Sequence, residues 1–161
     1  LEQSRRLILG RSGLTVLLLD DQNLRRPLTS SLAAEFGTRV VEEATAPEPN
    51  GVISARWAWW LEHQNQLPQP EQIIIALLPI ASLENPLTSA RVEQLKQRGQ
   101  DWFRSLLLPE ALSLLPAATS SLRRNGGRLA ILDGRVRGRG WGEQVLQCLQ
   151  PWVALHRLLP D

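Results

Sequence analysis

The sequence predicts an α/β fold with a mostly parallel sheet covered by helices on both faces. Short continuous runs of Leu, Val and Ile, such as 73–80, are typical of strands that are buried on both sides. Segments with a helical spacing of apolar residues alternate with these runs, which indicates a three-layer domain. At 161 residues the chain is long enough for one domain with a substantial core.

The expected elements follow one another along the whole chain. The expected strands are 14–21, 38–43, 51–55, 73–80 and 127–133, with 152–159 as a further edge strand. Helices are expected at 2–10, 22–37, 56–64 and 141–149, with two more inside 88–122. The segment 134–140 between the last strand and the last helix is expected to be a basic loop.

Local sequence features support the prediction of two of these helical regions. In 22–37, leucines and a phenylalanine recur every four residues, Gly37 is a typical C-cap, and Pro27 lies near the first turn. In 88–122, Pro109 is expected to divide two helices. The leucines expected to face the core there are Leu106, Leu107, Leu112, Leu114 and Leu115.

Composition excludes several classes of protein. A hydrophobic share of 43% with 21% charged residues is not that of a disordered chain, and no apolar run approaches the ~20 residues that cross a bilayer. The single cysteine, Cys148, excludes an internal disulfide and fits a reducing cytoplasm. With only His63 and His156 beside it, the composition does not favour a zinc site. Because the chain starts at Leu1, we expect a fragment of a longer protein.

The charges are distributed unevenly. Residues 1–122 carry 11 basic and 13 acidic groups, whereas 123–161 carry 7 and 3. Arg135, Arg137 and Arg139 alternate with Val and Gly after the last expected strand, and glycine lets backbone amides approach a phosphate. Phosphate contact is therefore expected for these arginines, and a solvated face is the alternative. Arg135 could instead pair with an acid and fix the loop.

Ligands of parallel sheets bind at the carboxyl ends of the strands. These ends are expected at Asp20–Asp21, Ser54–Trp57, Pro79–Ser82 and Asp133–Arg139. The two aspartates could bind Mg²⁺ or cap the following helix. The tryptophans of 56–60, Trp57 above all, could stack on unpaired bases or pack in the core. A Walker phosphate loop is absent, because the one lysine, Lys96, stands outside any such motif.

Several stretches, read in order, resemble the carboxyl-terminal motor domain of the DinG/XPD family of DNA helicases. They are "LTVLLLDDQNLRRPLTSSLAAEFG" (14–37), "IIIALLPIASLENPL" (73–87), "GQDWFRSLLLPEAL" (99–112) and "GRLAILDGRVRGRGWGEQVL" (127–146). The resemblance implies a RecA-like domain covering 1–161. Such a domain closes on an amino-terminal RecA-like domain that carries the Walker residues, with ATP and Mg²⁺ between the two and single-stranded DNA across both.

Two motifs of the family are eroded in this chain. The family's Q-x-x-G-R-x-x-R corresponds here to Ala117, Ser120, Ser121 and Arg124, so that only the last arginine remains. The family's F-W-E-G-x-D segment matches 57–68 only loosely. The resemblance implies that Arg124 is the trans-acting arginine of the full chain, and that the fragment alone hydrolyses nothing.

The nucleic-acid contacts expected from this resemblance and from the charge pattern involve a small set of side chains. They are Arg123, Arg135, Arg137, Arg139 and Trp57. The rival interpretations are a non-catalytic RecA-like module that binds DNA or protein, and a flavodoxin-like ligand-binding domain unrelated to helicases.

Overall fold

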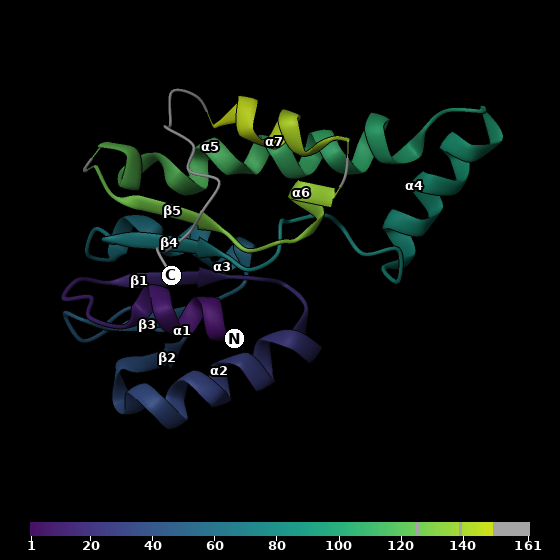
Figure 1. Ribbon diagram of the computed structural model, residues 1–161. Helices are drawn as coiled ribbons and strands as arrows, with labels where there is room; N and C mark the ends of the chain where they lie inside the picture. The colour runs from purple at the N-terminus through teal and green to yellow at the C-terminus, as the bar shows by residue number, and fades with distance from the viewer. Residues whose placement is uncertain (125, 139, 150–161) are drawn as a thin grey trace.

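A parallel sheet of five strands forms the centre of the molecule. The computed structural model describes residues 1–124, 126–138 and 140–149. The strands are β1 (Thr15–Leu18), β2 (Val40–Glu42), β3 (Val52–Ala55), β4 (Gln72–Ile75) and β5 (Arg128–Ile131). Their order is β2-β3-β1-β4-β5, and all four pairings are parallel (Figure 1). The predicted α/β class with a parallel sheet is confirmed, and it is consistent with a RecA-like three-layer fold.

Helices connect the strands. They are α1 (Glu2–Ile8), α2 (Gln22–Phe36), α3 (Trp57–His63), α4 (Pro86–Gln97), α5 (Leu108–Arg124), α6 (Arg135–Gly138) and α7 (Gly142–Cys148). A π-helical segment, Phe103–Leu107, leads directly into α5. Two short 3₁₀ turns, Gly37–Arg39 and Gln64–Gln66, follow α2 and α3. Among the described residues, no helix has both the length and the apolar character needed to cross a membrane.

The sheet separates two apolar cores, because successive side chains of a strand point to opposite faces. Val16 and Leu18 of β1 pack on one face with side chains of α3, α5 and α7. Leu17 and Leu19 pack on the other face with α1 and α2. The helices therefore cover both faces of the sheet, which is what continuous apolar strands require.

The division between α4 and α5 differs from the prediction. The break was expected near Pro109, but α4 ends at Gln97 and the chain turns through Gly99, whose φ is +71°. Pro109 is the second residue of α5 and follows the π-helical segment, whose wider turn leaves room for the proline ring. The true boundary is therefore marked by a glycine in the left-handed region and not by the proline.

Smaller corrections concern three other segments. Pro27 is the sixth residue of α2 and so lies beyond its first turn. The segment expected to be a basic loop contains the short helix α6. The expected strand at 152–159, together with His156, lies outside the described residues.

Candidate functional site

The segments that follow β1, β2 and β3 surround a hollow at the carboxyl edge of the sheet. Parallel strands bring these segments together, because all of them leave the sheet at the same edge. The hollow has a volume of about 390 Å³ and is lined by Asp20, Gln22, Arg25, Arg26, Glu42, Glu43 and Arg56. Three arginines thus face three carboxylates, which makes the hollow polar and close to neutral.

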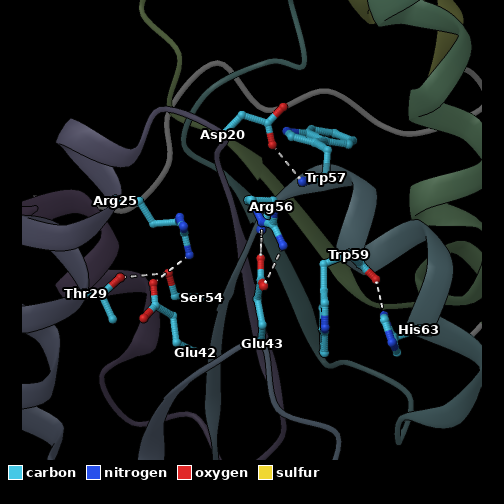
Figure 2. A network of polar contacts seen from close by, with 10 residues as sticks. All are labelled: Asp20, Arg25, Thr29, Glu42, Glu43, Ser54, Arg56, Trp57, Trp59 and His63. Carbon is cyan, nitrogen blue, oxygen red and sulfur yellow. Dashed lines mark hydrogen bonds and ion pairs between the residues drawn. The ribbon is translucent and has the colours of Figure 1, made fainter.

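Glu43 and Arg56 form a bidentate ion pair in this hollow (Figure 2). One carboxylate oxygen of Glu43 accepts hydrogen bonds from Arg56 Nε at 2.7 Å and from the Arg56 backbone N–H at 3.1 Å; the other accepts from Nη2 at 3.0 Å. The guanidinium lowers the pKa of Glu43, and the carboxylate raises the pKa of Arg56. Glu43 adopts a φ of 45°, in the left-handed region, so local backbone strain is held in place by a bidentate ion pair.

Arg25 is the most deeply buried cation that lines the hollow. It is 7% exposed and donates from Nη1 to Glu42 at 2.6 Å, while its Nε has no hydrogen-bond partner. Below it, Thr29 of α2 and Ser54 of β3 share a hydrogen bond of 2.7 Å (Figure 2). Arg25 therefore joins α2 to the end of β2 instead of projecting into solvent.

The two aspartates that follow β1 serve different helices. Asp21 accepts a hydrogen bond from the backbone N–H of Asn23 at 2.9 Å, so the prediction of a helix cap is confirmed for this residue. Asp20 accepts from the backbone N–H of Trp57, the first residue of α3, also at 2.9 Å. Within the described ranges, no group of three or more His, Cys, Asp or Glu residues could hold a metal ion.

Two of the tryptophans near this edge lie in the core. Trp57 is 1% exposed and donates from Nε1 to the carbonyl of Leu77 at 3.0 Å; Trp60 is fully buried and donates to Ala118 at 2.8 Å. These positions fit the packing interpretation. Stacking of Trp57 on a base would require its ring to leave the core.

Trp59, on the same helix, is the partly exposed tryptophan. Its ring stacks on His63 with 4.6 Å between centroids, and its carbonyl is 2.9 Å from His63 Nδ1. His63 is the last residue of α3 and is partly exposed. This face of Trp59 is therefore occupied by a neighbour of its own helix.

Asp133 organises the segment that follows β5. It is 5% exposed and accepts from the Leu78 backbone N–H at 3.1 Å, from the Arg135 backbone N–H at 3.1 Å and from Arg135 Nε at 2.8 Å, and it also accepts from Arg135 Nη2. Burial raises the pKa of Asp133, but these hydrogen bonds outweigh it and the pKa is lowered. Arg135 thus pairs with an acid and fixes the loop, as the second interpretation of this residue predicted.

The other predicted arginines do not gather at one edge. Arg123 and Arg124 end α5 beside the start of β5, where Gly127 N–H donates to Leu122 and Arg128 N–H donates to Glu71. This is the amino edge of the sheet, opposite the hollow. Arg137 belongs to α6, beyond the carboxyl end of β5, and Arg139 lies outside the described residues.

The paired arginines of the hollow were missed by sequence reasoning. Glu42 and Glu43 close the expected strand at 38–43, and Arg56 follows the next expected strand. Because β2 and β3 are direct neighbours, these residues come together at the strand ends. In the sequence, an acidic pair ends one expected strand and an arginine follows the next. Their pairing could have been inferred from this pattern only if the order of the strands in the sheet had been known.

Comparison with known proteins adds three partial similarities. The chain is 37% identical to the ATP-dependent DNA helicase YoaA of Escherichia coli over 82 residues, which is 49% of this chain and 13% of that protein. It is 30% identical to YoaA of Haemophilus influenzae over 125 residues, 76% of this chain and 20% of the relative. It is 31% identical to the 3'-5' exonuclease DinG of Bacillus subtilis over 80 residues, 48% of this chain and 9% of the relative.

The chain matches no protein-family profile. It spans a fifth or less of the length of the curated relatives that it matches. Two of these relatives are named ATP-dependent DNA helicases and the third is named an exonuclease. Taken with the parallel α/β sheet, the partial similarity supports a relationship between this chain and the DinG/XPD-like helicases.

Proposed function

We propose that this chain acts as the second RecA-like motor domain of a DinG/XPD-like ATP-dependent DNA helicase. In this role it binds single-stranded DNA and forms one wall of an ATP cleft against an amino-terminal RecA-like domain of the same longer chain. The observation that carries the proposal is the 30% identity over 125 residues to a protein named an ATP-dependent DNA helicase. The parallel sheet supports it, because the segments that follow its strands meet at the carboxyl edge, where ligands of such sheets bind.

In this proposal, ATP and Mg²⁺ are held by the other domain. The described residues of this chain do not by themselves fit a triphosphate. Arg25 and Arg56 are each paired with a glutamate, and the chain has no Walker lysine. We therefore expect the isolated chain to hydrolyse no ATP.

The phosphate contacts are assigned to the segment after β5 on chemical grounds. Arg135 is engaged by Asp133, so Arg137 and Arg139 are the arginines proposed to contact the backbone of DNA. Arg123 is proposed to add long-range attraction from the other edge, since it ends α5. Trp57, at 1% exposure, has no part in this assignment.

A second candidate function is a non-catalytic RecA-like module that binds DNA. One observation favours it: Arg124, the expected trans-acting arginine, ends α5 at the amino edge of the sheet. A four-residue strand is about 13 Å long at ~3.3 Å per residue, so a nucleotide at the carboxyl edge is far from this position. The replacement of the family's Gln and Gly-Arg by Ala117, Ser120 and Ser121 points in the same direction.

The two functions are separated by an ATPase assay of the chain with and without a Walker-bearing amino-terminal domain of a relative, each in the presence of single-stranded DNA. A motor domain restores DNA-stimulated hydrolysis in the mixture, and Arg124→Ala lowers its rate by about 10³-fold or more. A binding module leaves the ATPase unchanged while it still binds DNA. Turnover by the chain alone would refute the expected inactivity, and a folded chain without DNA affinity would refute both functions.

A further inference from the structure

A surface at the far end of α4 combines cations with a partly exposed tryptophan. Lys96 lies in the last turn of α4, with its ammonium 5.7 Å from the centroid of the Trp102 ring. Arg98 follows at the helix C-cap, and Arg104 is the second residue of the π-helical segment, with a side chain that is 51% exposed. Lys96, Arg98, Trp102 and Arg104 are called the α4 surface below.

The α4 surface stands apart from the hydrophobic core. Figure 1 shows α4 projecting away from the sheet, and Val92 is its one buried residue. The helix is fastened by that side chain and by an ion pair of 2.6 Å between Arg91 and Glu110. Neither of these two contacts involves a cation of the α4 surface.

The charges of the α4 surface are largely uncompensated. Among the described residues, neither Lys96 nor Arg98 has an ion-pair partner. Arg104 has one at 3.8 Å, Asp101, but one carboxylate oxygen of Asp101 already accepts backbone N–H groups of Phe103 and Arg104. A long, exposed contact of this kind contributes little, so the guanidinium is available to an external anion.

The α4 surface lies beside Trp141, the N-cap residue of α7, and beside Gly140 before it. Phe103 lies 5.5 Å from Trp141 between ring centroids, which joins the π-helical segment to the start of α7. A Cβ built on Gly140 would lie 3.8 Å from Arg104 Nη2, so this guanidinium sits beside the residue that follows Arg139. The exposed cations of the α4 surface therefore lie beside the end of the segment that follows β5.

From this juxtaposition we infer that Trp102 is a stacking platform for a base of single-stranded nucleic acid, with Lys96, Arg98 and Arg104 contacting the phosphates on either side. An aromatic ring bordered by unpaired cations is the combination that binds unpaired strands without sequence preference. Trp59 differs, because the neighbour stacked on its ring is His63, whereas Trp102 has the Lys96 ammonium near its ring and meets Phe103 edge to face. The inference rests on the proposed function as far as DNA is the ligand.

The test is the affinity of the 161-residue chain for labelled oligo(dT), measured by fluorescence anisotropy at matched salt. Trp102→Ala weakens binding about 5- to 150-fold, the loss expected for one stacked base. Trp102→Phe keeps affinity within about threefold of the wild type, because a phenyl ring still stacks. The matched control, Trp59→Ala, removes another partly exposed tryptophan and leaves the affinity unchanged.

A second measurement tests the contribution of the three cations to DNA binding. Replacing Lys96, Arg98 and Arg104 together by Gln lowers the slope of log K against log[salt] by about 2, at ~0.7 per lost contact with a single strand. Circular dichroism shows whether each variant is folded. Trp102→Ala with wild-type affinity, or equal competition by polyglutamate, which would indicate an acidic protein partner, overturns the inference and leaves the proposed function standing. A folded wild-type chain that binds no oligo(dT) overturns both.

Discussion

Replacing Asp133 by Asn tests how the segment after β5 is held. The carboxylate accepts hydrogen bonds from the Leu78 backbone N–H and from three donors of Arg135, and its side chain is 2% exposed. An amide of the same size has one acceptor oxygen, and its NH₂ group faces donors instead of accepting from them. We therefore expect Asp133→Asn to destabilise the fold although its volume is unchanged.

The expected loss in the free energy of unfolding is the sum of the costs for the donors that lose their acceptor. The Leu78 N–H is buried, and a buried donor left without an acceptor costs about 1–3 kcal/mol. Arg135 is 38% exposed and can be hydrated, so loss of its ion pair costs only about 1 kcal/mol. The sum, about 2–4 kcal/mol, corresponds to a fall of roughly 5–15 °C in the unfolding midpoint of a domain of this size.

Thermal unfolding followed by circular dichroism measures this difference, with Glu84→Gln, an exposed acid, as the control within about 0.5 kcal/mol of the wild type. The pKa of Asp133 is lowered in the folded chain, so its contribution to stability is complete above the pKa of an unfolded aspartate and is lost as the pH falls through the lower pKa of the folded state. The difference in unfolding midpoint between wild type and variant should therefore be largest at neutral pH and disappear in acid. Equal midpoints at neutral pH would refute the assigned role.

Two further substitutions test the core. Gly127→Ala brings a Cβ into the Leu122 side chain and within 2.9 Å of the Glu71 carbonyl. We therefore expect the free energy of unfolding, measured in urea, to fall by about 1–3 kcal/mol. An unchanged midpoint would mean that the turn between α5 and β5 adapts to the added methyl group. Trp60→Phe removes the bond to the Ala118 carbonyl and leaves unfilled volume, at a cost of about 1–3 kcal/mol; a near-ultraviolet spectrum and stability equal to wild type would contradict this.

The strands were predictable because their signal is local and strong. Ile73, Ile74 and Ile75 are apolar and fully buried in β4, as a strand covered on both faces requires, whereas the rest of the expected run to 80 lies beyond the end of the strand. The order of the strands was not predictable by the same reasoning, since it depends on which helix packs on which face. Without the order, the meeting of Glu43 with Arg56 could not be derived, although both residues were expected at strand ends.

In the helical region 88–122, the spacing of apolar residues alone does not identify the buried face, because the buried face shifts along the helix at the π-helical segment. Of the five leucines expected to face the core, Leu107 and Leu115 are buried, while Leu106, Leu112 and Leu114 are partly exposed. The buried apolar positions described within α5 are Leu108, Ala111, Leu115, Ala118 and Leu122, a regular helical stripe that includes two alanines. Alanine was overlooked because the larger leucines dominated the pattern.

The π-helical segment also determines where Arg104 of the α4 surface lies. A π turn holds one residue more than an α turn, and each residue of an α-helix advances by about 100°. An uninterrupted α-helix from Phe103 would therefore rotate Arg104 by roughly that angle relative to the stripe of α5 that packs on the sheet. With the π turn, Leu107 and Leu108 both reach the core while the Arg104 guanidinium lies beside Gly140. The extra residue thus brings the exposed Arg104 beside the segment after β5, to which the DNA contacts of the proposed function are assigned.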